Sequence, residues 1–245
     1  MPLRTTTTVV ASLAVALAAA VALTGCVAVG GDAGPTVSES RDISGVTGVT
    51  LNTSGKLSIT TGSTPSLTIT AGKKELSRLT SEVSSGVLIL DEKHELFGDR
   101  GAVTYDLVLP DVAEIRVNGS GDAVADLVRT SSRSDELTLT IEGSGDITAR
   151  GVDADKVTVD VEGSGSVDVA GSASKQSVNL EGSGDYKAAR LDSADAVVVI
   201  AGSGHATVRA TTTLDATIEG SGSLTHSGGA RITSHISGSG ELTRG

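Results

Sequence analysis

Large and aromatic side chains are scarce in this chain of 245 residues. It contains one Phe, two Tyr and no Trp, so aromatic residues make up 1% of the sequence. An α/β enzyme of this length normally fills its core with large side chains, and the composition argues against such a fold. Glycine is abundant, at 31 residues, but no Gly-X-Y period runs through the chain, which excludes collagen. Because 38% of the residues are hydrophobic and alternate with polar ones, disorder is disfavoured.

Cysteine occurs once, at Cys26, and its position indicates a lipid anchor. Residues 1–25 carry one charge, Arg4, before the short apolar stretch Val9–Leu23, as in a secretory signal peptide. This stretch ends in the letters LTGC, which look like the lipobox that is cleaved before a lipid-bearing Cys. Its length of about 15 residues is below the ~20 residues of a transmembrane helix. We therefore predict export, removal of residues 1–25, and lipid anchoring of Cys26 to the cell membrane, facing outside the cytoplasm.

Basic residues and further cysteines are also lacking, which limits the partners and the stabilising bonds of the exported part. The chain has 19 Lys and Arg against 30 Asp and Glu, for a net charge of −11. Such a surface repels nucleic acid and anionic lipid headgroups, so membrane attachment is expected to come from lipid alone. A single Cys excludes an internal disulfide. Residues 26–41 are rich in Gly, Ala and Ser and are predicted to form a flexible tether after the lipidated Cys.

A Gly-Ser-Gly repeat dominates the rest of the chain. Each copy follows an apolar residue and one further residue, as in Ile141-Glu142-Gly143-Ser144-Gly145. The first glycines of the seven copies are Gly119, Gly143, Gly163, Gly182, Gly202, Gly220 and Gly238. The six steps between them average about 20 residues, which is typical of a solenoid repeat.

Apolar residues recur at every second position within each copy, which predicts strands rather than helices. Val157, Val159 and Val161 precede the motif at Gly163, and Val167 follows it. Since all these positions are odd, one face continues through the motif, and both glycines are expected to point inward. Two short strands and two corners then form one coil of a parallel β-helix. One coil buries too little apolar surface to offset its backbone entropy, so the coils have to stack.

Residues 42–110 show the same alternation without the regular repeat. They are predicted to form an irregular N-terminal β cap on the Gly-Ser-Gly solenoid of residues 111–245, because solenoids need atypical ends. Val49–Ile59 looks like a degenerate first coil, and Lys73–Arg78 is expected to form a helical turn. Further strands are predicted at Ser66–Thr70, Leu79–Val83, Val87–Asp91 and Ala102–Leu109.

This combination resembles the bacterial family described as "putative auto-transporter adhesin, head GIN domain", here as a lipoprotein. The resemblance covers residues 42–245. It is carried by Asp42-Ile43-Ser44-Gly45-Val46, by Thr53-Ser54-Gly55, and by the Gly-Ser-Gly-Asp copies at 119–122, 143–146 and 182–185. The resemblance implies an all-β fold, a right-handed parallel β-solenoid, and an adhesive role. It implies no catalytic residues and no cofactor.

Stacking in register is expected to place equivalent side chains in rows on the outer face. The motif serines would form one row, with an acidic row on either side. One hypothesis is a weak divalent-cation stripe, since hard cations take carboxylate oxygens. Its residues would be Glu142, Asp146, Glu162, Glu181 and Asp185. The alternative is a solvated face on which hydroxyls relieve the charge. A zinc site is not expected, because the four histidines lack the required spacing and there is no second Cys.

Two further features suggest contacts with other molecules. Val197, Val199 and Ala201 are expected to point outward from one coil and to form a small apolar contact patch. The alternative is three isolated surface residues, which are common. The last coil also leaves an unpaired strand edge. Either charged side chains such as Arg231 blunt this edge, or two chains stack end to end as a homo-oligomer.

The sequence therefore indicates a binding or structural module of the cell envelope rather than an enzyme. Seven equivalent serines argue for structure and against a single activated nucleophile, and no helix follows them as in a nucleophile elbow. The partner is expected to be an unidentified protein or glycan. The alternative hypothesis is an enzyme or sensor acting on envelope polysaccharide, which would require a coil where acids and a base interrupt the repeat within a groove.

Overall fold

The computed structural model describes residues 34–93, 101–127 and 134–245. All of them belong to the compact unit Gly31–Gly245, whereas the predicted signal peptide and Cys26 lie outside the described residues. The described part is nearly all strand and forms a β-solenoid of about six turns with a spacing of about 20 residues. This confirms the all-β solenoid that the alternation and the repeat predict.

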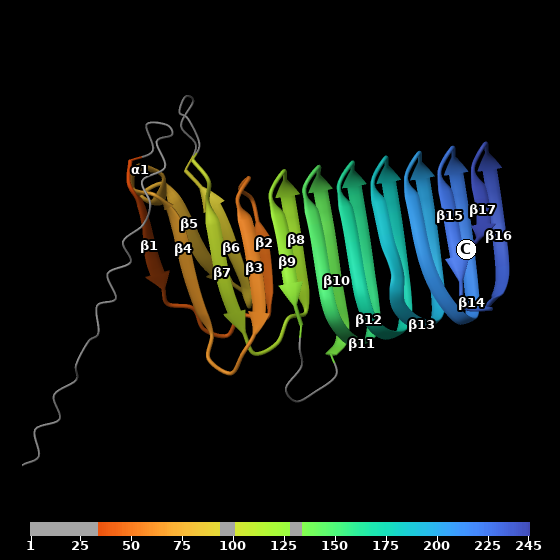
Figure 1. Ribbon diagram of the computed structural model, residues 1–245, viewed down its shortest axis with the longest axis horizontal. Coiled ribbons are helices and arrows are strands. Elements are labelled where there is room, and N and C mark those ends of the chain that lie inside the picture. The colour runs from red at the N-terminus through yellow and green to blue at the C-terminus, as the bar shows by residue number, and fades with distance from the viewer. Residues whose placement is uncertain (1–33, 94–100, 128–133) are drawn as a thin grey trace, which may run out of the picture. The chain divides into compact units, whose positions relative to one another are not determined.

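The regular part of the solenoid adds one coil to the next along a single direction (Figure 1). Its strands are β8 (Glu114–Gly119), β9 (Asp122–Asp126), β10 (Ser134–Gly143), β11 (Asp146–Gly163), β12 (Ser166–Gly182), β13 (Asp185–Gly202), β14 (His205–Gly220), β15 (Ser223–Ser227), β16 (Arg231–Gly238) and β17 (Glu241–Arg244). Neighbouring strands pair in parallel, and each first glycine lies opposite the first glycine of the next coil.

Two walls of strands enclose the core. The first wall consists of β8, β10, the C-terminal halves of β11 to β14, and β16. The second wall consists of β9, the N-terminal halves of β11 to β14, β15 and β17. The Gly-Ser-Gly bends join the walls along one edge, at the top of Figure 1. At the opposite corner the strand bends without ending, where the pairing register shifts between Ala149 and Val152.

The core consists of files of aliphatic side chains that run across the coils. One file on the first wall is Val117, Ile141, Val161, Leu180, Ile200 and Ile218, in register from coil to coil. All six have no exposed surface. Burying a side chain of this kind stabilises the folded state by about 1.5–3 kcal/mol. Since this file continues from coil to coil, each interior coil is stabilised by the neighbours on both of its sides.

The two glycines of each motif have different roles, which corrects the expectation that both point inward. The second glycines are buried, except the half-buried Gly240 of the last coil. A Cβ added to Gly165 would lie 2.8 Å from Cγ2 of the core residue Ile141. The first glycines have φ values between +104° and +138°, a region that favours glycine. A Cβ on Gly163 would collide with the carbonyl oxygen of Gly143 in the preceding coil, so this position faces along the stack. The odd-numbered positions are nevertheless buried on both sides of the bend, from Val157 to Val161 and from Gly165 to Val169, so the predicted face does continue through the motif.

The N-terminal part adds antiparallel strands to this scheme. Its elements are β1 (Thr36–Arg41), β2 (Gly48–Leu51), β3 (Lys56–Thr61), β4 (Ser66–Gly72), α1 (Lys73–Leu76), β5 (Leu79–Ser84), β6 (Val87–Glu92) and β7 (Thr104–Leu109). The predicted strands and the helical turn are thus present. The coil of β2 and β3 lies between the coil of β6 and β7 and that of β8 and β9, so the stacking order differs from the chain order. The expected cap is therefore interleaved with the solenoid.

The predicted tether ends earlier than expected. Thr36–Arg41 pairs along its whole length with β4 in an antiparallel ladder, so the end of the 26–41 segment is a strand. Its side chains alternate, and Val37 packs against the core while Ser38 hydrogen-bonds Thr70 at 2.8 Å. Flexibility was inferred from the Gly, Ala and Ser content of the segment, but the ladder to β4 satisfies its backbone hydrogen-bonding groups and orders its end as a strand.

Both described tyrosines are inside the core and have hydrogen-bond partners there. Thr53 donates to the Tyr105 hydroxyl at 3.2 Å, and Tyr186 donates to Oε1 of Gln176 at 3.1 Å. The buried Gln176 amide also donates to Oγ of Ser193 at 2.7 Å. Desolvation by burial raises the pKa of both tyrosines above the ordinary value, so their hydroxyls stay neutral. In the second of these groups, Gln176 takes the place of an aliphatic residue in the file between Val157 and Ala196. Its bonds to Tyr186 and Ser193 join the coil of β12 to the coil of β13.

The replacement Gly165→Ala tests the close approach of the coils. The new methyl group would meet the Gly145 carbonyl and the Ile141 side chain, and we expect a loss of about 3 kcal/mol in the free energy of unfolding. The matched control is Ser164→Ala at the exposed neighbouring position, with an expected change within about 0.5 kcal/mol. Urea denaturation measures both. Equal midpoints for the two variants would contradict the packing described above.

Candidate binding surface

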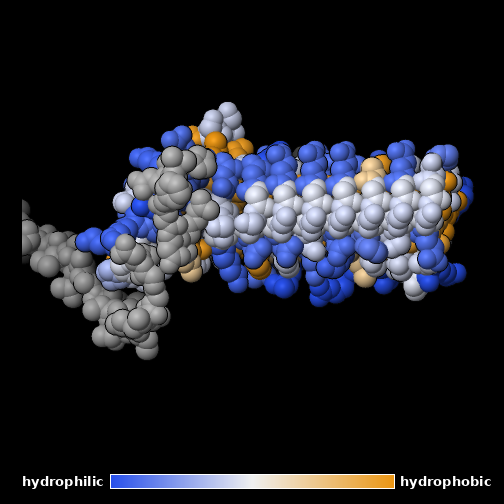
Figure 2. Space-filling view, turned by 90° about the horizontal axis from the view of Figure 1, so that it is seen from above, coloured by the Kyte–Doolittle hydropathy of each residue, from blue (hydrophilic) through white to orange (hydrophobic). Residues whose placement is uncertain are grey.

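A ridge of seven serines follows the bends of the solenoid. It consists of Ser120, Ser144, Ser164, Ser183, Ser203, Ser221 and Ser239, all exposed. From Ser144 onward, each serine N–H donates to the carbonyl of the first glycine in the preceding coil, at 2.8–2.9 Å. In Figure 2 the ridge is the continuous pale row, with hydrophilic side chains on both sides. Backbone bonds therefore hold the hydroxyls at the spacing of the strands, as the repeat predicts.

The row of residues beside the ridge on the first wall extends further than the repeat indicates. The acids Glu142, Glu162 and Glu181 lie in register in it, as expected. On the N-terminal side the row continues through Asn118 and Asn52 to Asp91. Asn118 donates to Asn52 at 2.9 Å, and Asn52 donates to Asp91 at 3.1 Å. Asn118 belongs to the repeat and was expected in this row, whereas Asn52 and Asp91 were missed because the stacking order of their coils differs from the chain order.

The row on the second wall braces the stack. Asp146 accepts the Ser166 N–H at 2.9 Å, and Asp122 accepts the Asp146 N–H at 3.3 Å. Asp185 lies 3.3 Å from the Lys187 ammonium and 3.5 Å from Nδ1 of His205. Each of these carboxylates thus contacts a backbone N–H group or a basic side chain of its own coil or of the next coil.

The five acids predicted as a cation stripe are thus divided between the two walls, with the serine ridge between them. Glu142 also pairs with Arg116 at 2.8 Å. Within the ranges that the structure describes, no group of three or more His, Cys, Asp or Glu side chains is arranged to hold a metal ion. The stripe and its solvated alternative both stay predictions.

The predicted contact patch lies on the outer face of the first wall. Val197, Val199 and Ala201 are half-buried between polar neighbours of the adjoining coils. Asn179 and Thr217 flank Val199, for example. The apolar strip is therefore one coil wide.

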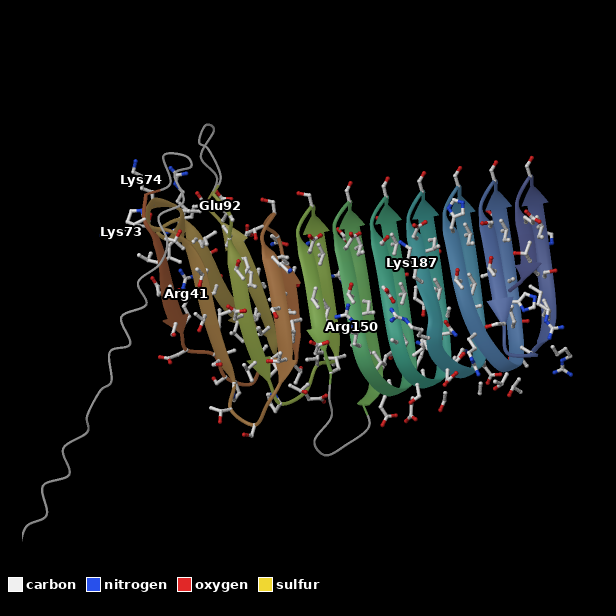
Figure 3. The ribbon with its side chains drawn as sticks, in the orientation of Figure 1. Arg41, Lys73, Lys74, Glu92, Arg150 and Lys187 are labelled. Atoms are coloured by element: carbon white, nitrogen blue, oxygen red, sulfur yellow. The ribbon has the colours of Figure 1, made fainter. Side chains whose placement is uncertain are left out.

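A small hollow opens where the extended row meets the ridge. Its volume is about 170 Å³, and it is lined by Asn52, Thr53, Ser54, Asp91, Glu92, Asn118, Gly119 and Ser120. Glu92 is labelled in Figure 3, at the upper end of β6. The lining has two carboxylates but no His, Lys or Arg. Oδ1 of Asn118 is buried and has no hydrogen-bond partner among the described residues. An acid and a base facing each other in a groove, as the enzyme hypothesis requires, are not present in this hollow.

The chain matches one family and several solved structures. The sequence model of the family described as "Putative auto-transporter adhesin, head GIN domain" matches residues 46–230, which confirms the resemblance. A "putative adhesin" from Bacteroides fragilis is 20% identical, with a TM-score of 0.75 over 86% of this chain and 97% of that one. A "putative lipid binding protein" from Parabacteroides distasonis is 25% identical, with a TM-score of 0.70 over 88% and 98%. A "putative adhesin" from the same species is 20% identical, with a TM-score of 0.68 over 88% and 98%.

No curated protein matches the sequence. No described helix has the length and apolarity required to cross a membrane.

Thermal melting in calcium and in chelator tests the cation stripe. Calcium would have to displace Arg116 from Glu142 and Lys187 from Asp185, so we expect equal midpoints in both buffers. A midpoint that is higher in calcium, and that falls to the chelator value in a Glu162→Gln, Glu181→Gln variant, would establish the stripe and contradict this expectation.

Proposed function

We propose that this chain, which belongs to the family described as "Putative auto-transporter adhesin, head GIN domain", is a binding module of the bacterial cell envelope. The family suggests an exported or surface protein that binds a partner. The proposed contact surface is the serine ridge with the polar row beside it on the first wall. Its partner is a protein or glycan of the envelope.

The regular geometry of the ridge carries this proposal. Every serine is exposed, and every one from Ser144 onward is held by a backbone bond to the preceding coil. The backbone of the ridge is therefore already ordered before a partner binds, which lowers the entropic cost of binding. A row of identical polar groups at constant spacing suits a partner with an extended or repeating surface better than it suits one small substrate.

A catalytic role receives less support from the residues. The polar hollow at Asn118 contains acids without a basic side chain. An enzyme or sensor for envelope polysaccharide is thus the weaker hypothesis.

Attachment to the membrane by lipid on Cys26 is part of the proposal. It is supported by the apolar stretch and the LTGC letters that precede this single Cys, and by an acidic composition that does not favour direct binding to anionic headgroups. The binding surface would then be displayed outside the cytoplasmic membrane.

Binding of the purified full chain to separated glycan and protein fractions of the envelope tests the contact surface. We expect one fraction to retain the protein, and a Ser164→Lys, Ser183→Lys variant to bind at least about tenfold more weakly. The matched control carries Ser172→Lys and Thr212→Lys, exposed positions away from the ridge, and should bind as the unaltered chain does. Equal binding of both variants, or no binding to either fraction, would contradict the proposal.

Labelling of cells with palmitate tests the anchor. The unaltered chain should incorporate the label and sediment with membranes, whereas Cys26→Ser should do neither, since it has no thiol to carry lipid. Membrane association of the unlabelled Cys26→Ser protein would point to another mode of attachment.

A further inference from the structure

The outer face of the first wall is rich in acids where it is formed by β11 to β14. Each of these four strands presents three outward residues there, which gives twelve. They are Thr158, Asp160 and Glu162 on β11, Ser177, Asn179 and Glu181 on β12, Val197, Val199 and Ala201 on β13, and Asp215, Thr217 and Glu219 on β14. Five of the twelve are acidic, and none is Lys, Arg or His. We call these twelve residues the acidic face.

The outer face of the second wall has bases beside its acids on the same four strands. Asp168 lies 3.1 Å from Arg190, and Asp185 lies 3.3 Å from Lys187. Figure 3 labels Lys187 and Arg150, two of the basic residues of this wall. The two walls therefore differ in charge although they belong to the same coils. The excess of acids on the first wall is thus a local property, and the acidic composition of the whole chain does not account for it.

The carboxylates of the acidic face have no basic partner of their own. Asn179 donates to the Glu181 carboxylate at 3.3 Å. The side chains of the other four acids form no ion pair or hydrogen bond within the ranges that the structure describes. Glu162 and Glu181 are neighbours in register, so one strand spacing of ~4.8 Å separates them at the backbone. Like charges that lie directly opposite each other repel, and a positively charged partner relieves this repulsion.

An apolar strip runs through the acidic face along β13. Its residues are the half-buried Val197, Val199 and Ala201. On β14, Asp215 lies opposite Val197, and Glu219 lies opposite Ala201. On β12, Glu181 lies opposite Ala201. The strip is therefore bordered by acids on both sides.

We propose that the acidic face binds a basic polypeptide segment in which an apolar stripe is bordered by Lys or Arg on both sides. This partner rests on the proposed function, since the row beside the serine ridge is part of the same surface. The apolar stripe of the segment lies on β13, and its basic side chains extend over β12 and β14 to the carboxylates. The strip is ~13 Å long, which is the length of about nine residues of an α-helix.

Other classes of partner fit the acidic face less well. Nucleic acid and anionic lipid headgroups are repelled by its charge. A bound divalent ion takes several oxygen ligands, whereas no three His, Cys, Asp or Glu side chains in the described part of the chain are grouped to hold one. The twelve residues include no aromatic ring on which a sugar could stack. The complementary charge and the apolar strip together favour a basic protein segment.

Fluorescence anisotropy with a synthetic probe tests this partner chemistry. The probe is a labelled amphipathic helix of Leu and Lys, about 14 residues long, and its counterpart has Glu in place of every Lys. We expect the full chain carrying Cys26→Ser to bind the Lys probe, and to bind it more weakly as the salt concentration rises. The Glu probe should not bind.

A pair of charge variants locates the binding site. Glu162→Gln, Glu219→Gln removes one carboxylate on each side of the strip and should bind the Lys probe at least about threefold more weakly. The matched control, Asp42→Asn, Asp106→Asn, changes the net charge by the same amount at exposed positions outside the acidic face. It should bind as the unaltered chain does. All four side chains are exposed, so the variants are expected to fold, and circular dichroism checks this.

A second pair of variants tests the apolar strip. Val199→Ser removes the central apolar side chain and should weaken binding of the Lys probe about threefold. Its control is Val124→Ser, which changes a half-buried residue on the outer face of the second wall and should have no effect. Equal binding of these two variants would show that the strip takes no part.

Failure of the basic partner is distinct from failure of the proposed function. No binding of the Lys probe, equal binding of both probes, or equal loss in the charge variant and its control would overturn the basic partner. Retention of the chain by the glycan fraction of the envelope alone would overturn it too, but the contact surface stands if the Ser164→Lys, Ser183→Lys variant loses that binding. Retention by the protein fraction, lost in Glu162→Gln, Glu219→Gln and kept in its control, would support both.

Discussion

The close approach of one backbone to the next at each bend constrains the whole solenoid. The carbonyl of a motif glycine occupies the place where a side chain of the following coil would lie, so glycine is required twice in every repeat. The first glycine supplies the positive φ that turns the chain from one wall to the other, and the second brings the bend against the core. The serine between them has no inward direction available and points to solvent. The regular ridge on the outer face is thus a consequence of packing on the inner face.

Much of this architecture could be predicted from the sequence, because alternation and repeat length are local signals. Val157, Val159 and Val161 point to strands without knowledge of the partners, and seven motifs at steps of 18 to 24 residues point to stacked coils. The role of the first glycines could not be predicted, because periodicity carries no information about φ. The strand at Thr36–Arg41 depends on a ladder to β4, and the Asp91–Asn52–Asn118 row depends on the order in which coils stack. Such contacts join residues that are distant in the sequence. The acids and their placement on either side of the serines could also be predicted from the repeat, but the hydrogen bonds and ion pairs that they form could not.

Stacking also explains why the two ends of the unit have different chemistry. Each interior coil is covered on both sides, whereas a terminal coil needs a different cover or a partner. The N-terminal end has antiparallel strands and the Glu39–Arg41 pair, which bridges the walls through Ser81. The C-terminal end continues the aliphatic files without interruption.

Removal of one whole coil measures most directly whether register stacking holds the fold together. Deletion of residues 144–163 joins Gly143 to Ser164 and brings β12 against β9 and β10 in register. Aliphatic residues then lie opposite aliphatic residues at the inward positions, except that the buried Gln176 lies opposite Leu137. The account predicts that this shortened chain folds cooperatively, with an unchanged shape of the far-ultraviolet circular dichroism spectrum and a lower urea midpoint. A shortened chain that is unfolded in the absence of urea would contradict it.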